Sequence, residues 1–243
     1  MRYQVNVLFP GFSGRLKNGR LNWGTVALIQ GCGHNILMDC GGMVIRSNLK
    51  AMLADYSLKC EDIDTILLSH MHADHVYNID YFPHAQIYLS KAEWEHAYDM
   101  KDRDFSVGEH AACLLRSFRL NLIEKEEEII PGIRTMMTPG HTPGCMSYVL
   151  DQEEQGLWIL TGDAVKNRYE LTDERVQQTL CEEESINSIR RIKAMAGRVL
   201  PGHDCWLQIR DRNVIAEGGN DIVFQFGQGI RVNGQTAITF SME

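Results

Sequence analysis

The sequence predicts an α/β protein in which mixed β-sheets are covered by helices. In both halves of the chain, short apolar segments typical of strands are followed by segments whose apolar residues recur at helical spacing. The 243 residues, 44% of them hydrophobic, suffice for one large domain with a substantial core. No linker-like stretch interrupts the chain, so we expect a single domain over residues 1–243.

The N-terminal part alternates between strand-like and helix-like segments. The stretch from 11 to 22 is rich in Gly, Asn and Arg, and we expect it to be a loop. The elements expected around it are strands at 3–9, 24–29, 36–38, 63–68 and 86–89, and helices at 45–56 and 91–100.

The C-terminal part starts with a charged and aromatic segment, 101–125, in which no secondary structure is predicted. The elements expected beyond it are a strand pair at 129–137, a hairpin of 147–150 and 157–160, an amphipathic helix at 182–196, a strand at 198–200, and hairpins from 209 to 240 around 217–220 and 233–234.

The most informative stretch is Ser69-His70-Met71-His72-Ala73-Asp74-His75, which follows an apolar run at 66–68. Three imidazoles and one carboxylate within six residues are too polar for a core segment, where each buried polar group needs a partner. Imidazole and carboxylate are usual ligands of zinc and similar ions, so the stretch predicts metal binding. Residues 70, 72 and 74 of an extended chain point to one side, and His75 joins them if a helix begins there.

Three later fragments place a single His or Asp in a turn that follows a strand-like run. They are Thr138-Pro139-Gly140-His141-Thr142-Pro143-Gly144, Thr161-Gly162-Asp163 and Pro201-Gly202-His203-Asp204. Turns of this kind lie at strand ends, where loops can converge on one site. Five of the nine histidines belong to the four motifs, which makes a chance grouping improbable.

In order, spacing and flanking residues, these motifs resemble the metallo-β-lactamase-fold hydrolase superfamily, from about Asn22 to His203. The resemblance implies an αββα sandwich of two mixed β-sheets flanked by helices, which the alternation of strands and helices fits. One departure is visible. After His75 the usual Gly-Gly is replaced by Val76-Tyr77-Asn78-Ile79, which we expect to reshape one wall of the pocket.

The resemblance also implies a binuclear metal centre. The implied ligands are His70, His72 and His141 for one ion, Asp74, His75 and His203 for the second, and Asp163 as a bridge between them. Asp39, in an Asp-x-Gly element, would support the site without binding metal. The implied cofactors are two divalent ions, zinc in the first place, with iron or manganese as alternatives that the ligand types accept equally.

Such a site lets two ions share a water whose pKa falls towards neutrality, and the metal-bridging hydroxide then attacks a carbonyl or phosphoryl centre. Asp74 would be the catalytic residue that orients the hydroxide and relays its proton. A nucleophilic Ser or Cys is not needed, and the sequence shows no nucleophile-elbow motif.

Two features narrow the reaction. True metallo-β-lactamases carry a Cys ligand in place of Asp163, and the β-rich tail does not resemble the helical glutathione-binding region of glyoxalase II. We therefore predict a metal-dependent hydrolase acting on an ester, thioester or lactone of a small molecule. Candidate substrate contacts are Lys166, Arg168 and Tyr169, although Tyr169 is out of register with the tyrosine of lactonases.

Three alternatives stay open. A phosphodiesterase or ribonuclease of the same fold is the first, and a mononuclear-iron oxidoreductase similar to persulfide dioxygenases is the second. The third is a metal-stabilised binding module that turns over no substrate. Metal stoichiometry and a substrate panel separate these classes.

Composition bears on partners and location. The net charge of −8 argues against sequence-independent binding of nucleic acid, although two divalent ions would add positive charge at the site. No apolar run approaches the roughly 20 residues that span a bilayer, and the N-terminus lacks a signal-peptide pattern, so we expect a cytoplasmic protein without membrane contact. Seven cysteines without CxxC pairs indicate reduced thiols, and Cys145 and Cys205 are candidates to line the site.

Overall fold

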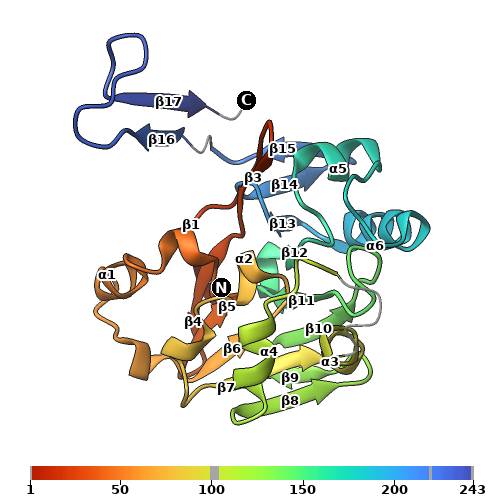
Figure 1. Ribbon diagram of the computed structural model, residues 1–243. Coiled ribbons are helices and arrows are strands. Elements are labelled where there is room, and N and C mark those ends of the chain that lie inside the picture. The colour runs from red at the N-terminus through yellow and green to blue at the C-terminus, as the bar shows by residue number, and fades with distance from the viewer. Residues whose placement is uncertain (1, 99–103, 219–220, 242–243) are drawn as a thin grey trace.

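The first sheet places the N-terminal part of the chain in one layer. The computed structural model describes residues 2–98, 104–218 and 221–241 (Figure 1). In spatial order the strands of this sheet are β1 (Gln4–Phe9), β4 (Val26–Gly31), β5 (His34–Met38), β6 (Thr65–Leu67), β7 (Gln86–Ser90) and β8 (Arg119–Ile123). The first three pair antiparallel, whereas β5 to β8 run parallel and are joined by helical crossovers.

The second sheet is built from the C-terminal part. In spatial order its strands are β15 (Asn213–Ala216), β14 (Leu207–Arg210), β13 (Arg198–Pro201), β12 (Leu157–Gly162), β11 (Met146–Asp151), β10 (Ile133–Met137) and β9 (Glu128–Ile130). Only β12 and β13 pair in parallel, and both sheets are therefore mixed.

Helices cover the outer face of each sheet. The α-helices are α1 (Leu49–Ala54), α2 (Ala73–Val76), α3 (Lys91–Tyr98), α4 (Glu109–Leu115), α5 (Arg168–Asp173) and α6 (Glu182–Met195). Short 3₁₀ turns occupy Met43–Ile45, Cys60–Asp62, Ile79–Tyr81 and Glu153–Gln155. Figure 1 shows α1 and α4 on the side of the first sheet and α5 and α6 on the side of the second.

The alternation of side chains along the strands explains this layering. Ala27 and Ile29 of β4 belong to the core between the sheets, together with Tyr148 and Leu160 of the second sheet. Leu28, the residue between them on β4, packs into the core beneath α1 and α4. A third core lies between the second sheet and α5 and α6. The predicted αββα sandwich of mixed sheets is therefore confirmed.

The stretch 11–22 is not the loop that the sequence analysis predicts. It forms a β-hairpin of β2 (Phe12–Leu16) and β3 (Gly19–Trp23). Lys17 and Asn18 form its two-residue turn, since Leu16 pairs with Gly19. The tip carries few apolar residues because it is exposed, whereas the base is anchored by Trp23, whose ring centroid is 4.9 Å from that of Phe12. This hairpin becomes important at the site.

The tail contains two hairpins, as predicted, but the first turns elsewhere. β14 and β15 are joined at Asp211 and Arg212, whose φ values of 50° and 67° lie in the left-handed region, and not around 217–220. Residues 219 and 220 lie outside the described residues. The second hairpin, β16 (Asp221–Gln225) with β17 (Ala237–Ser241), has Asn233-Gly234 between its strands and stands off the sandwich (Figure 1).

Two further segments differ from expectation. The helix expected at 45–56 is shorter, because only 49–54 is α-helical. The segment 101–125 contains α4 and β8, with 101–103 outside the described residues, as are 99 and 100 at the end of the helix expected at 91–100.

Candidate metal centre

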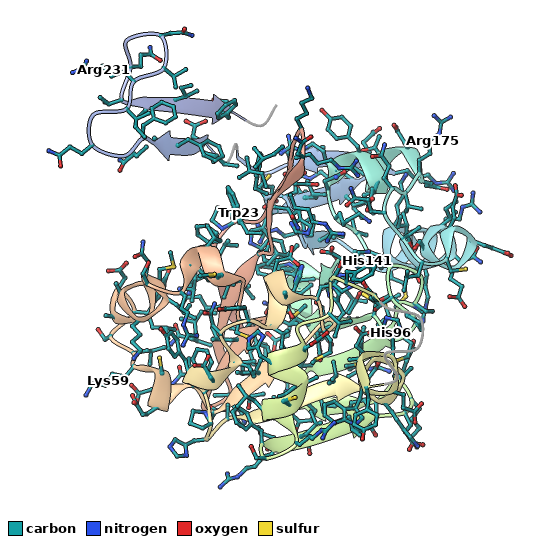
Figure 2. All side chains as sticks on the ribbon, in the orientation of Figure 1. Trp23, Lys59, His96, His141, Arg175 and Arg231 are labelled. Atoms are coloured by element: carbon teal, nitrogen blue, oxygen red, sulfur yellow. The ribbon has the colours of Figure 1, made fainter. Side chains whose placement is uncertain are left out.

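Four loops at one end of the sandwich bring the sequence motifs together. β6 ends at Leu67 and leads into the 69–75 motif, in which α2 begins at Ala73. His141 follows β10, Asp163 follows β12 and His203 follows β13. In Figure 2 His141 lies where the two halves of the sandwich meet. Strands of both sheets therefore position one group of side chains.

The first cluster consists of His70, His72 and His141. One ring nitrogen of each lies within 4.8 Å of those of the other two, and Nε2 of His141 is 3.0 Å from Nδ1 of His72. All three side chains are buried. This spacing suits three imidazoles that share one ion.

The second cluster consists of Asp74, His75 and His203. Oδ2 of Asp74 lies 4.0 Å from Nε2 of His75 and 3.7 Å from Nε2 of His203. His75 and His203 are buried, whereas Asp74 is partly exposed to the cavity described below.

Asp163 lies between the clusters. Its Oδ2 is 3.2 Å from Nε2 of His141, and its Oδ1 is 3.2 Å from Nε2 of both His75 and His203. Oδ2 is also 3.2 Å from Nε2 of His203, so the carboxylate as a whole faces both clusters, as a bridging ligand must. The structure thus brings all seven ligands proposed from the sequence into one group.

Several candidate metal-binding atoms of the group are left without a hydrogen-bond partner by the chain as the structure describes it. Among the described residues, Nε2 of His70, Nε2 of His75 and Oδ1 of Asp163 are buried and lack a hydrogen bond. Such buried unsatisfied atoms are rare in folded proteins and need an explanation. Three of them converge here, in a set of imidazoles and carboxylates, and two divalent ions would satisfy them all.

The electrostatics of the group support the same reading. Burial disfavours a charged ring and holds the pKa of His70 and His141 well below the ordinary value, so both rings are neutral, as ligands must be. Burial acts the same way on His75 and His203, but the facing carboxylates, Asp163 foremost and Asp74 among the others, together outweigh it and raise the pKa of both. Burial opposes ionisation of Asp163, yet the three facing imidazoles hold its pKa well below the usual range. Positive charge is therefore favoured around Asp163.

Asp39 supports the centre from behind, at the place proposed for it. It is buried and accepts hydrogen bonds from the backbone N–H of Ser69 (2.8 Å), from the Ser69 hydroxyl (2.8 Å) and from Nδ1 of His75 (2.7 Å). Its φ of 55° lies in the left-handed region. Donation from Nδ1 leaves the Nε2 lone pair of His75 pointing at the cluster, so Asp39 fixes the tautomer that can bind metal.

Three other ligands are held at their outer nitrogen by groups that the motifs do not contain. Nε2 of His72 lies 2.8 Å from Oδ2 of Asp104, Nδ1 of His141 lies 3.2 Å from the carbonyl of Gln178, and Nδ1 of His203 lies 2.8 Å from the carbonyl of Trp23. Burial opposes ionisation of Asp104, but hydrogen bonds from His72 and His96 lower its pKa. Sequence reasoning missed Asp104 because it lies in the segment without a recognisable pattern.

Glu93 joins two of the metal loops. It is fully buried on α3 and accepts hydrogen bonds from the backbone N–H of Met71 (2.8 Å) and from the hydroxyl of Thr142 (2.6 Å). Met71 lies between His70 and His72, and Thr142 follows His141. The carboxylate therefore fixes the spacing between the two halves of the first cluster.

The residues that replace the usual Gly-Gly do not form a pocket wall, contrary to expectation. The side-chain amide of Asn78 donates to the carbonyls of Cys40, Gly41 and Gly42, at 2.9, 3.2 and 2.9 Å. It therefore holds the turn after Asp39, and residues 76–79 do not line the cavity described below.

A cavity of about 340 Å³ opens over the cluster. Its lining includes His72, Asp74, His141, Asp163, His203, Lys166, Arg15, Arg20, Asn22, Asp104 and Gln178. The β2–β3 hairpin thus walls the cavity, which the expectation of a loop at 11–22 did not foresee. Nδ2 of Asn22 donates to Oδ2 of Asp74 (2.6 Å) and so orients the proposed catalytic carboxylate.

The proposed substrate contacts lie in three different surroundings. Lys166 lines the cavity, with its Nζ 2.9 Å from Glu170. Tyr169 is exposed and lines an adjoining cavity of about 530 Å³. Arg168 lines neither, since its guanidinium makes two bonds to Asp204, at 2.9 and 2.7 Å, beside His203. Cys145 and Cys205 are buried and do not line the cavity over the cluster.

The chain belongs to the metallo-beta-lactamase superfamily, whose family model matches residues 24–224. This confirms the family inferred from the motifs. Among characterised relatives, an N-acyl homoserine lactonase of Bacillus cereus is 31% identical over 166 residues, which are 67% of this chain and 64% of the lactonase. Metallo-beta-lactamase domain-containing protein 1 of Xenopus laevis is 27% identical over 207 residues, or 83% of this chain and 79% of the relative. The match thus spans less than two thirds of the lactonase.

Solved structures of lactonases share the fold. One is an N-acyl homoserine lactone hydrolase with the product N-hexanoyl-L-homoserine bound at the catalytic metal center. It superposes with a TM-score of 0.68 at 21% identity, covering 84% of this chain and 93% of the other. The dizinc quorum-quenching lactonase AidC gives a TM-score of 0.67 at 17% identity, covering 82% and 81%. In this chain, no helix in the described ranges is long and apolar enough to cross a membrane.

Proposed function

We propose that this protein is a binuclear metal-dependent hydrolase that opens a lactone, or cleaves an ester or thioester, of a small molecule. The position of Asp163 carries the proposal: its carboxylate oxygens lie 3.2 Å from imidazole nitrogens of both clusters. A carboxylate shared in this way supports a two-ion site.

Two divalent ions, when bound, supply a water of lowered pKa and a Lewis acid for the oxygen of the scissile carbonyl. The chain supplies the orientation. His70, His72 and His141 would hold one ion, and Asp74, His75 and His203 the other, with Asp163 bridging. Asp74 is the proposed proton carrier, because it is the ligand partly open to the cavity and Asn22 occupies only its Oδ2, which leaves Oδ1 to accept a proton.

Lactones are the substrate class that the comparisons support best, because N-acyl homoserine lactonases are among the relatives in sequence and in fold. Zinc is the proposed metal, since one of the similar structures is a dizinc enzyme. The cytoplasm is the proposed location: all seven cysteines carry free thiols, which suits a reducing compartment.

The test combines metal analysis with turnover. Protein purified without added metal is assayed for zinc, iron and manganese, and then with a panel of lactones, esters, thioesters and phosphodiesters. We expect about two zinc ions per chain, hydrolysis of a lactone or ester, and loss of both in Asp163→Ala and His72→Ala. His84→Ala, which changes an exposed histidine outside the cluster, is the matched control. One iron per chain without hydrolysis, or turnover of phosphodiesters alone, would overturn the proposal.

A further inference from the structure

The hairpin that walls the cavity is positively charged without a compensating acid. Residues 11–23 contain Arg15, Lys17 and Arg20 but no Asp or Glu, although the protein as a whole has a net charge of −8. Arg15 and Arg20 are directly opposite each other in the register of β2 and β3. Like charges at opposed positions of a hairpin destabilise it. This pairing therefore has a cost that an anion between the two guanidinium groups would remove.

Both arginines line the cavity, and both have neutral partners. Arg20 donates to the hydroxyl of Ser106 (2.8 Å), and Arg15 lies against the side-chain amide of Gln178. In the part of the chain that the structure describes, neither guanidinium is within ion-pair distance of a carboxylate. Lys166, the other cation of the lining, is by contrast matched by Glu170 at 2.9 Å.

The acids that share the cavity are already engaged. Asp163 and Asp74 face the imidazoles of the two clusters, and Asp104 is bonded to His72 and His96. The positive charge of the hairpin is therefore available to a ligand. A cavity of about 340 Å³ is of the size that holds one small organic molecule, so a single ligand can reach both the cluster and the arginines.

We propose that Arg15 and Arg20 form a subsite for an anionic group, so that the substrate is a small lactone or ester carrying a carboxylate or phosphate away from the scissile bond. The inference rests on the proposed function for the scissile bond, but the anion subsite stands on the hairpin alone. Two guanidinium groups suit either oxyanion, because their N–H donors match its oxygens in pairs.

The first arm of the test measures selectivity. The probes are γ-butyrolactone and γ-carboxy-γ-butyrolactone, which differ by one carboxylate. We expect wild-type protein to prefer the carboxylated ring in kcat/KM. In Arg15→Gln/Arg20→Gln that preference falls at least about tenfold, mainly through KM, since a charge-assisted contact is lost. The preference also falls with added salt, which screens an exposed subsite. Lys17→Gln, the third cation of the hairpin, does not line the cavity and serves as the control.

The second arm needs no turnover. Binding of glutarate and of glycerol 3-phosphate to metal-free protein is measured by calorimetry, and the two anions distinguish a carboxylate subsite from a phosphate subsite. We expect the double variant to bind the preferred anion at least about tenfold more weakly than Lys17→Gln does. Equal binding by both variants would overturn the inference even if the protein hydrolyses lactones. Arginine-dependent binding without hydrolysis would uphold the subsite and refute the proposed function.

Discussion

Asp39→Asn tests whether the metal centre depends on a buried carboxylate that does not touch the metal. The carboxylate accepts three hydrogen bonds, two from Ser69 and one from Nδ1 of His75. An amide has one oxygen and one NH₂ group. If the oxygen keeps the backbone N–H of Ser69, the NH₂ group faces His75, whose Nδ1 must then accept. That tautomer carries its proton on Nε2, the atom that should bind metal.

The size of the effect follows from these contacts. A hydrogen bond to a charged group contributes about 1.5–3 kcal/mol, and at least one is lost, so we expect a loss of about 2–3 kcal/mol in the free energy of unfolding. For a chain of this length that lowers Tm by roughly 4–12 °C. Loss of such support for a metal-binding histidine also weakens metal affinity by about 10–100-fold.

Two measurements check this, thermal unfolding of the metal-free protein and competition for zinc with a chelator. The control is Asp80→Asn, which removes a partly exposed carboxylate paired with Arg46 and should cost under about 1 kcal/mol with no change in metal affinity. If Asp39→Asn binds two ions as tightly as wild type and unfolds at the same temperature, the tautomer argument is wrong.

Three further predictions concern an ion pair, a buried carboxylate and a thiol. Burial opposes ionisation of Asp204, but hydrogen bonds from Arg168 lower its pKa. Arg168→Met should therefore lower the free energy of unfolding by about 3 kcal/mol at neutral pH, and Asp204→Asn in the same protein should recover part of this loss. Urea unfolding across pH should show the loss shrinking below about pH 4, where Asp204 is protonated. Glu93→Ala leaves two buried donors without an acceptor and should cost about 2–4 kcal/mol and lower zinc content, whereas a cost under about 0.5 kcal/mol would contradict its role. Hydrogen bonds from Tyr3 and Arg2 lower the pKa of the exposed Cys32 thiol, whereas burial raises the pKa of Cys145. Iodoacetamide at pH 7.5, followed by peptide mass spectrometry, should therefore label Cys32 before Cys145. Equal labelling of Cys32 and Cys145 would contradict this prediction.

The metal motifs could be predicted because their chemistry is local. The first motif is recognisable as a metal-binding pattern without a structure, because it places four potential ligands within six residues: His70, His72, Asp74 and His75. Apolar periodicity also predicts the strands that precede His141 and His203. The αββα layering follows from the same periodicity once the family resemblance is added.

What could not be predicted depends on contacts between distant residues. The β2–β3 hairpin alternates only weakly, because Gly14 and Gly19 occupy positions in phase with its apolar residues, and its Gly, Asn and Arg content favours a loop. The turn at Asp211 and Arg212 uses left-handed backbone at both residues; Asp tolerates this conformation, but Arg seldom adopts it and no Gly marks the position. Asp104 has no local pattern, because its role is defined by His72, 32 positions away.

Trp23 connects the metal centre with the two hairpins, β2–β3 and β16–β17, that lie outside the two sheets of the sandwich. Its carbonyl holds His203, and its ring packs on Phe12 at the base of the β2–β3 hairpin and, at 6.2 Å, near Phe224 of the projecting hairpin. Residues that would react with a substrate therefore come from the strand ends of the sandwich, whereas residues that would select a substrate come from the β2–β3 hairpin, whose base packs around Trp23. A new specificity could accordingly be grafted by exchanging residues 13–20, which leaves Asn22 and Trp23 in place beside Asp74 and His203.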